Sequence, residues 1–417
     1  MDIGIIGLGD MGKLYARRLS EAGYNVLGSD KPENIKKLRR ELIDSGVSVL
    51  DRGVDVSRKS DFIVYSVEAE NIAQVVREYG LATKPGAIVS GQTSVKTPEV
   101  KAFDNFLPED VSIIPCHSLH GPKVNSDGQS LAVINHRSNE RDYKKALGVF
   151  RKIGSEIVEM ASFEEHDRIT ADTQALTHLS FQSMGAAWQR MGSFPWRDPS
   201  YAGGIDNVKV AMTLRIFHGK PHIYAGLALL NPFVRDQTKQ YANSVSDLFK
   251  IMISEDESEF RDRVYGAKEF VFGKDRGFIS LDDKTMEEFG LGISSEKRKP
   301  NSHLSLFGMV DAWHKLGINP YDNMICQTPP YKLRLGIAEL LFKDDNLLEE
   351  SIMAAVHDRK IRWDDFEFCN AVRHWEYIIG SGDMDSYKSQ FENTKSFFKR
   401  KLKEGQRISS ELIDKIA

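Results

Sequence analysis

The fold is decided by the stretch Ile3-Gly4-Ile5-Ile6-Gly7-Leu8-Gly9-Asp10-Met11-Gly12 near the start of the chain. Its first part, residues 3–6, reads as a short buried strand, and residues 13–22 after it have the composition of a helix. Residues 24–27 predict a second strand, which is followed by Asp30. A Gly-x-Gly-x-x-Gly turn that joins a strand to a helix, with an acid about 20 residues further on, is the context that a dinucleotide-binding fold requires.

Each glycine of this turn has a separate physical task in such a fold. Gly7 permits the tight turn, Gly9 lets the backbone approach the pyrophosphate, and Gly12 lets the helix pack closely on the strand. The start of the helix adds free N–H groups and positive potential for the phosphates. The predicted cofactor-binding residues are therefore Gly7, Leu8, Gly9, Asp10, Met11 and Gly12, together with Asp30 and Lys31.

Asp30 and Lys31 leave the choice of cofactor open at this point. An acid at position 30 would bond the adenosine ribose hydroxyls, which favours NAD over NADP. Lys31, directly after it, could instead meet the 2′-phosphate of NADP. The residues alone lean modestly toward NAD.

Strands and helices continue to alternate beyond this point. Further strands are predicted at residues 62–66, 87–90, 111–115, 131–135 and 156–159. This alternation predicts a mostly parallel, doubly wound sheet, and hence a Rossmann-like α/β domain over residues 1–160. Ligands gather at the carboxyl ends of such strands. Two segments, 90–96 and 116–122, follow predicted strands in this way.

The second half of the chain is helical and contains a repeat. Residues 177–192 match residues 302–317 at seven of 16 positions, and the offset of 125 persists where Pro195 meets Pro320. We interpret this as an all-α region built from two degenerate copies of a helical domain. The copies are expected at residues 163–273 and 299–405, with a linker at 274–298 and a C-terminal tail at 406–417.

Composition and charge exclude several classes of protein. The 417 residues carry a formal net charge of −4, so no basic excess is available for contacts along a duplex, and nucleic acid is not an expected partner. Three cysteines cannot build a disulfide framework and are typical of a reduced, cytoplasmic compartment. The sequence shows no signal peptide and no apolar run of about 18 residues, so no membrane partner is expected.

His117 is the strongest candidate for acid–base chemistry. It follows the predicted strand at 111–115, with Cys116 before it and His120 after it, and a histidine titrates near neutral pH. We therefore expect acid–base work near the nicotinamide, with a solvated loop histidine as the alternative. A metal site is not expected, because neither CxxC nor HExxH occurs in the sequence.

Two residues of the first helical copy are further candidates. Arg215 lies in an otherwise apolar helical run, where a buried guanidinium needs a partner. A substrate carboxylate, bound bidentately, would be one; an internal ion pair or an exposed helix face is the alternative. The counterpart in the second copy is Leu340, so the scaffold does not require an arginine here. His178 could reach a cleft, but His303 occupies its place in the second copy, which fits a packing role.

Four motifs together resemble those of a known family. The Gly-x-Gly-x-x-Gly turn is generic. More specific are Thr93-Ser94-Val95-Lys96, His117-Ser118-Leu119-His120-Gly121-Pro122, and Glu165-His166-Asp167 followed by a helix that carries His178. With these motifs the chain resembles the prephenate dehydrogenases, most closely the fungal type, along essentially its whole length. Ser118 stands where the bacterial pattern has proline, and the position of the catalytic histidine is intact.

The resemblance implies an activity and a set of site residues. The activity is oxidative decarboxylation of prephenate to 4-hydroxyphenylpyruvate and CO2 in tyrosine biosynthesis, and the fungal type uses NADP. His117 would be catalytic and hydrogen-bonded to the ring hydroxyl of the substrate, and Ser94 would hold both in register. Arg215 would grip the ring carboxylate, His178 would line the prephenate pocket, and Lys96 would also bind substrate.

Three alternatives stay open at this stage. One is arogenate dehydrogenase, which performs the same chemistry on the amino acid. Another is a β-hydroxyacid dehydrogenase, for which the sequence offers no convincing helix lysine. The third is a non-catalytic regulator that senses NADP. Because helical domains of the resembling family form dimers, we expect either a monomer with an internal pseudo-dimer or a homodimer.

Overall fold

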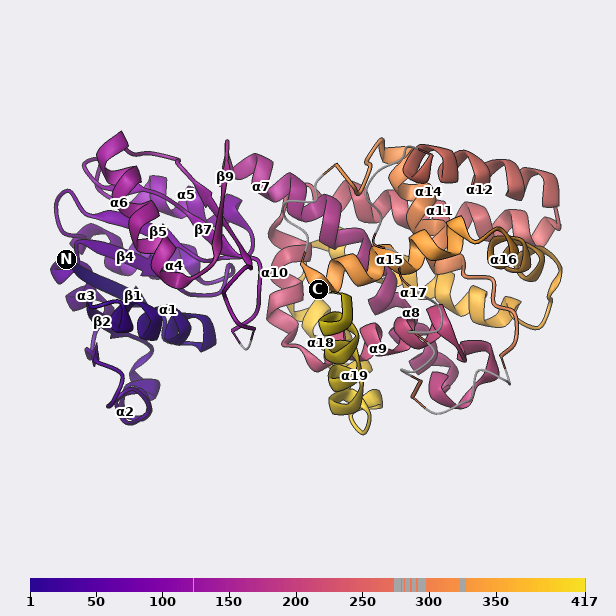
Figure 1. Cartoon of the computed structure of the whole chain (residues 1–417), viewed down its shortest axis with the longest axis horizontal. Helices are drawn as coiled ribbons and strands as arrows, with labels where there is room; N and C mark the ends of the chain where they lie inside the picture. The colour runs from indigo at the N-terminus through magenta and orange to yellow at the C-terminus, as the bar shows by residue number, and fades with distance from the viewer. Residues whose placement is uncertain are drawn as a thin grey trace. The chain divides into compact units, whose positions relative to one another are not determined.

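The computed structural model (Figure 1) describes residues 1–122, 124–273, 279, 281, 286, 290–291, 298–322 and 328–416. The chain forms two compact units. The first unit consists of Met1–Ile169 with Leu230–Pro232, and the second of Thr170–Leu229 with Phe233–Ala417. The linker expected at 274–298 lies almost entirely outside the described residues.

A six-stranded parallel sheet forms the centre of the first unit, with strand order β3-β2-β1-β4-β5-β6. Its strands are β1 (Asp2–Ile6), β2 (Asn25–Ser29), β3 (Val47–Val49), β4 (Phe62–Tyr65), β5 (Ile88–Gly91) and β6 (Ser112–Ile113). The helices that follow these strands are α1 (Asp10–Glu21), α2 (Pro32–Glu41), α3 (Gly53–Lys59), α4 (Ile72–Tyr79) and α5 (Lys96–Phe106). The strand order reverses between β1 and β4, which is the switch point where dinucleotides bind in such sheets.

The strands are apolar on both faces. Ile3 and Val64 belong to one buried cluster, whereas Ile6 and Ile63 belong to another. Near-continuous apolar strands of this kind are typical of a parallel sheet that helices cover on both sides. The predicted Rossmann-like architecture is therefore confirmed for the first six strands. The short strand β3 was not predicted, because its three residues are only partly buried or exposed.

The last strands of the first unit correct the prediction of a single sheet. β7 (Cys116–Ser118), β8 (Ser130–Ile134) and β9 (Glu156–Met160) form a separate three-stranded sheet, in which β7 is antiparallel to β8. Pro115 separates β6 from β7 and has no N–H to continue the ladder. His117 consequently lies within a strand rather than in a loop after one.

Two more helices, α6 (Glu140–Phe150) and α7 (Phe163–Thr170), follow the strands of the second sheet. We expected the helical copies to begin at residue 163, but residues through Ile169 belong to the first unit. The physical reason is that His166 and Asp167 of α7 bond to residues of β7 and α5. Short helical turns occur at Gly80–Ala82, Arg151–Ile153, Pro195–Arg197 and Pro199–Tyr201, with a π-helical segment at Ala171–Ala175.

The second unit is helical and contains two successive series of helices. The first series is α8 (Leu176–Met191), α9 (Gly204–His218), α10 (Pro221–Leu230), α11 (Val234–Ser254) and α12 (Glu257–Phe272). The second series is α14 (Leu304–Leu316), α15 (Pro329–Lys343), α16 (Asp345–His357), α17 (Arg362–Ser381) and α18 (Met384–Phe398). The bounds of α15 are those of α9 shifted by 125 residues, and the other pairs correspond nearly as closely.

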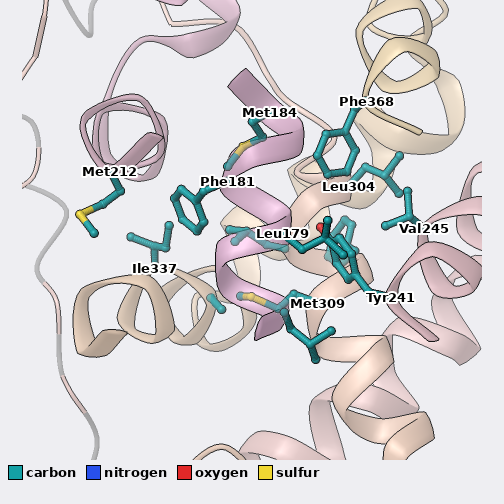
Figure 2. Packing of buried hydrophobic residues seen from close by; sticks show 14 of the residues in the cluster. Leu179, Phe181, Met184, Met212, Tyr241, Val245, Leu304, Met309, Ile337 and Phe368 are labelled. Atoms are coloured by element: carbon teal, nitrogen blue, oxygen red, sulfur yellow. The ribbon is translucent and has the colours of Figure 1, made fainter. Parts of the chain in front are cut away.

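The two series share one hydrophobic core. Helix α8 packs on α17, while its counterpart α14 packs on α11, the counterpart of α17. The counterparts α8 and α14 also contact each other, and Ser180 donates a hydrogen bond to the carbonyl of Ser305, 125 residues away. Figure 2 shows this core around α8, with Met212 and Ile337 on one side and Leu304 and Val245 on the other.

The chain ends in another helix, α19 (Leu402–Ile416), which packs on α9 and α15. This corrects the expected tail at 406–417, because Ile408 and Leu412 are buried in the core of the second unit. Among the residues that the structure describes, no helix is both long enough and apolar enough to cross a membrane.

Candidate active site

The glycine turn after β1 has the geometry of a pyrophosphate-binding loop. Gly7 has a φ of +95°, and a Cβ there would lie 2.3 Å from the carbonyl oxygen of Ser66. A Cβ on Gly12 would lie 2.0 Å from the carbonyl oxygen of Gly7, so α1 can pack this closely only on glycine. A Cβ on Gly9 would meet no described atom within 4 Å, and Gly9 caps α1 without a side-chain hydrogen bond. The N–H groups of the first turn of α1 are therefore suited to a dinucleotide pyrophosphate.

Asp30 is tied to this loop from within the protein. Its Oδ2 atom accepts a hydrogen bond from the Leu8 N–H at 2.6 Å, and its Oδ1 atom accepts one from the Asn34 side chain at 2.7 Å. The Asp30 carboxylate thus braces the glycine loop as well as standing at the ribose position. Lys31 beside it is exposed and supplies a cation, so the pair can accept a ribose that carries a phosphate.

A row of three buried side chains includes His117. The Nδ1 atom of His117 in β7 lies 2.9 Å from Nε2 of His166, and Nδ1 of His166 lies 2.9 Å from Oδ1 of Asp167. Because the carboxylate can only accept, His166 donates from Nδ1 and its Nε2 accepts from Nδ1–H of His117. This assignment leaves a lone pair on Nε2 of His117. His117 is therefore oriented as a proton acceptor.

The environment keeps His117 neutral. Burial lowers the pKa of His117 well below its ordinary value, and the nearby His166 and Lys96 act in the same direction. Burial also lowers the pKa of His166, against the opposing effect of Asp167. For Asp167, burial raises the pKa, but hydrogen bonds from His166 and from the backbone of α5 leave it lowered overall. An ionised Asp167 next to two neutral imidazoles is the state that the proton-acceptor assignment needs.

Asp167 also fixes the turn that carries Ser94. Its two oxygens accept the N–H groups of Lys96 and Thr97, each at 2.7 Å, at the first turn of α5. Ser94 lies two residues before α5 and is half-buried. The structure therefore attaches both the Ser94 turn and the His117 row to the same carboxylate. Sequence reasoning did not give His166 and Asp167 this role, although their Glu-His-Asp motif was the available signal.

Lys96 has a different setting from the one expected. It is fully buried, and its Nζ atom donates to Glu99 at 2.7 Å and to the carbonyls of Cys116 at 2.6 Å and Gly91 at 3.2 Å. These three acceptors use all the donors of an ammonium. None is left for a substrate, so the contacts make Lys96 a tie between β5, α5 and β7.

His178 and Arg215 lie in the second unit. The ring of His178 in α8 stands edge-on to Tyr224, with centroids 5.1 Å apart, and burial lowers the pKa of His178 well below its usual value. Arg215 in α9 donates to the hydroxyls of Ser410 at 2.9 Å and Ser409 at 3.3 Å. Within the described residues Arg215 has no ion pair, so the internal salt bridge considered from the sequence is not found there. Burial lowers the pKa of this guanidinium, although Tyr224 and Asp414 oppose the effect.

The sheet order, the glycine loop and a buried neutral histidine with a free lone pair together define a nicotinamide-dinucleotide-dependent dehydrogenase. Comparison with known proteins narrows this class. The chain is 46% identical to prephenate dehydrogenase [NADP(+)] of Saccharomyces cerevisiae, over 99% of this chain and 93% of that protein. The chain belongs to the prephenate dehydrogenase family, and within it to the fungal NADP type. The resemblance drawn from the motifs is therefore confirmed.

Other comparisons agree with this family. The chain is 44% identical to a probable prephenate dehydrogenase [NADP(+)] of Schizosaccharomyces pombe, over 99% of this chain and 97% of that protein. Residues 175–417 match a "6-phosphogluconate dehydrogenase C-terminal domain" family, and residues 2–90 match "NADP oxidoreductase coenzyme F420-dependent". A prephenate dehydrogenase from A. aeolicus, solved with hydroxyphenyl propionate and NAD+, has a similar fold, with a TM-score of 0.52 and 20% identity. That match covers 94% of the bacterial chain but only 63% of this one, so this chain carries a large additional part.

Proposed function

We propose that this chain catalyses the oxidative decarboxylation of prephenate to 4-hydroxyphenylpyruvate and CO2 with NADP, as a step of tyrosine biosynthesis. The names of the two fungal relatives support the substrate and the cofactor. The structural observation that carries the proposal is the row from His117 through His166 to Asp167, which presents a neutral imidazole nitrogen as a base.

His117 takes the proton of the substrate in this reaction. Its Nε2 atom accepts the proton of the C4 hydroxyl, and the charge that develops on the imidazole is stabilised through His166 by Asp167. When bound, NADP supplies a nicotinamide ring that accepts a hydride from C4. The ring carboxylate leaves as CO2, and the electrons of the broken C–C bond enter the ring, which becomes aromatic. Ser94 is proposed to hold the hydroxyl and His117 in register.

Arg215 is proposed to bind the ring carboxylate, and His178 to line the substrate pocket. In support, Arg215 has only hydroxyl partners from α19 and no carboxylate bonded to it among the described residues. A guanidinium held in this way can exchange a weak neutral partner for a charged one. Because the carboxylate departs as neutral CO2, Arg215 orients the substrate without retaining the product through this group.

Gly7, Gly9 and Gly12 are proposed to cradle the pyrophosphate of NADP, with Leu8, Asp10 and Met11 completing the loop. Lys31 is proposed to pair with the 2′-phosphate. The exposed position of Lys31, beside an Asp30 that already accepts the Leu8 N–H, favours this over a site for an unphosphorylated ribose. The bacterial structure contains NAD+, so the chain at positions 30 and 31 is where we expect the difference to arise.

We further propose that the two helical series are degenerate copies that pair within one chain as a pseudo-dimer. The matched order of helices supports this, as does the exchange of partners in which α8 packs on α17 and α14 on α11. Light scattering of the purified protein should then give the mass of one chain. An obligate homodimer would contradict the internal pairing. A cytoplasmic location is proposed because the described cysteines, Cys116 and Cys369, are both free thiols.

One assay tests the proposed function. Purified protein is incubated with prephenate or arogenate, and with NADP or NAD, while the absorbance of the reduced nicotinamide is recorded. Prephenate with NADP should give the highest kcat/KM of the four combinations. Turnover of arogenate in preference to prephenate, or no reduction of either cofactor, would contradict the proposal.

A further inference from the structure

A second arginine lies buried next to the site residues of the second unit. Arg334 belongs to α15, in the second helical series, and only 3% of it is exposed. Its Nη1 atom donates to Oγ1 of Thr177 in α8 at 2.9 Å, and its Nε atom donates to the carbonyl of Pro330 at 3.0 Å. Its guanidinium carbon lies 5.9 Å from the ring centre of Phe181. These contacts use two of the five donors of a guanidinium, and no carboxylate among the described residues bonds to it.

Arg334 shares its surroundings with Arg215. Burial lowers the pKa of Arg334 to about 10, and the positive charge of Arg215 contributes to that lowering. Both arginines act on the pKa of Tyr224, which burial raises and the two cations lower. Arg334 also lowers the pKa of His178. Two guanidinium groups therefore lie near one tyrosine and one histidine, and no described carboxylate bonds to either of them, which is costly unless an anion binds there.

The corresponding place in the other half of the unit is neutralised. With the offset of 125, Arg334 corresponds to Lys209 and His178 to His303. Lys209 donates to Asp206 at 2.9 Å and contacts Nδ1 of His303 at 2.8 Å. The cation near His303 thus has a counter-ion three residues earlier on its own helix.

The second series has lost that counter-ion. The residue that corresponds to Asp206 is Tyr331, whose hydroxyl is buried and has no hydrogen-bond partner among the described residues. The residue that corresponds to Arg215 is Leu340. As a result, the surroundings of His178 hold two cations with no described acid bonded to either, whereas the equivalent place holds a balanced pair. The two halves have therefore diverged in charge in a way that packing alone does not require.

We propose that Arg334 binds the side-chain carboxylate of the substrate while Arg215 binds the ring carboxylate, an inference that rests on the proposed function. Prephenate is a dianion whose two carboxylates both belong to the end of the molecule opposite the C4 hydroxyl. Two neighbouring guanidinium groups match that charge distribution. The second helical series thus supplies a substrate-binding residue in addition to its packing role.

The same arginine selects against the amino acid form of the substrate. Arogenate carries an ammonium group beside its side-chain carboxylate, where prephenate carries a neutral keto group. Placing that ammonium near a buried guanidinium is unfavourable, because like charges repel strongly where water is excluded. Arg334 therefore favours prephenate over arogenate, which distinguishes the two closest candidate substrates.

A comparison of Arg334→Gln with Arg215→Ala tests the assignment. The probe is 3-(4-hydroxyphenyl)propionate, which has a side-chain carboxylate but no ring carboxylate. Arg334→Gln should raise both the KM for prephenate and the Ki for the probe by about 10- to 100-fold, the value of a hydrogen bond between charged groups. Arg215→Ala should raise the KM for prephenate and leave the Ki for the probe within about twofold. Arg334→Gln should also lower the preference for prephenate over arogenate.

Two controls keep the outcome interpretable. Arg373→Gln removes another guanidinium from the second unit, one that bonds to Asn243 and Ser246 of α11, and should leave the probe Ki unchanged. If Arg334→Gln does not fold, Arg334→Lys keeps the charge but not the paired donors, and should still raise the Ki. An unchanged Ki and an unchanged substrate preference in the Arg334 variants would overturn the inference while the wild type remains active. Absence of prephenate turnover in the wild type would instead overturn the proposed function itself.

Discussion

The Nδ1 atom of His117 lies 2.9 Å from the Nε2 atom of His166, and this contact joins a strand of the small sheet to helix α7. His166 in turn bonds to Asp167, which also accepts two N–H groups at the start of α5. The base of the proposed reaction is therefore held by a carboxylate that the fold already needs for a helix N-terminus. This connection explains why residues 163–169 belong to the dinucleotide-binding unit.

Replacing His166 by phenylalanine should lower kcat about 10- to 100-fold. The substitution keeps a ring of similar shape but removes the acceptor for Nδ1–H of His117, so the correct tautomer of His117 is no longer favoured. The KM for NADP should stay unchanged. The matched control is His136→Phe in the same unit, since His136 bonds to Asp104 near the surface. An unaltered kcat in His166→Phe would show that the row of histidines does not orient the base.

The acid limb of the kcat/KM profile should lie well below pH 6.5. Burial lowers the pKa of His117 from its ordinary value of 6.5, so the neutral, proton-accepting form persists as the pH falls. Activity should be lost only when the pH drops through that lowered pKa. The measurement is kcat/KM for prephenate across the acid range, with enzyme stability checked at each pH. An acid limb at or above pH 6.5 would mean that His117 titrates as an exposed histidine does.

Lys31→Ala should raise the KM for NADP about tenfold and change the KM for NAD little. Lys31 is exposed beside Asp30, and the loss of one charge-assisted bond to the 2′-phosphate has about this effect. Lys59→Ala, an exposed lysine at the end of α3, serves as the matched control. Equal changes in the two KM values would remove Lys31 from the phosphate site.

The parts of the fold that follow local rules were accessible from the sequence. The spacing of Gly7, Gly9 and Gly12 predicts the loop because backbone sterics admit only glycine at close approaches such as those of Gly7 and Gly12. The helical repeat was accessible because equivalent positions, such as Trp188 and Trp313, are both buried packing residues. Each of these features depends on neighbours that lie close in the sequence or recur at a constant offset.

Features that depend on distant contacts were not accessible in the same way. The separate sheet of β7, β8 and β9 depends on pairings that the strand pattern alone does not specify. Lys96 read as a polar residue at a strand end, but the fold places Glu99 and two carbonyls around its ammonium. Arg334 stands in an apolar run much as Arg215 does, yet only the packing of α15 on α9 and the bond to Thr177 place it near His178.

The most direct test of the account is the turnover of His117→Asn with prephenate and NADP, measured beside the affinity for NADP. Asparagine retains a polar side chain of smaller size but cannot accept the hydroxyl proton. The account predicts that kcat falls by about 10²- to 10⁴-fold, the usual contribution of a positioned general base, while the Kd for NADP stays within about twofold. A kcat equal to that of the wild type would contradict the assignment of His117 as the catalytic base.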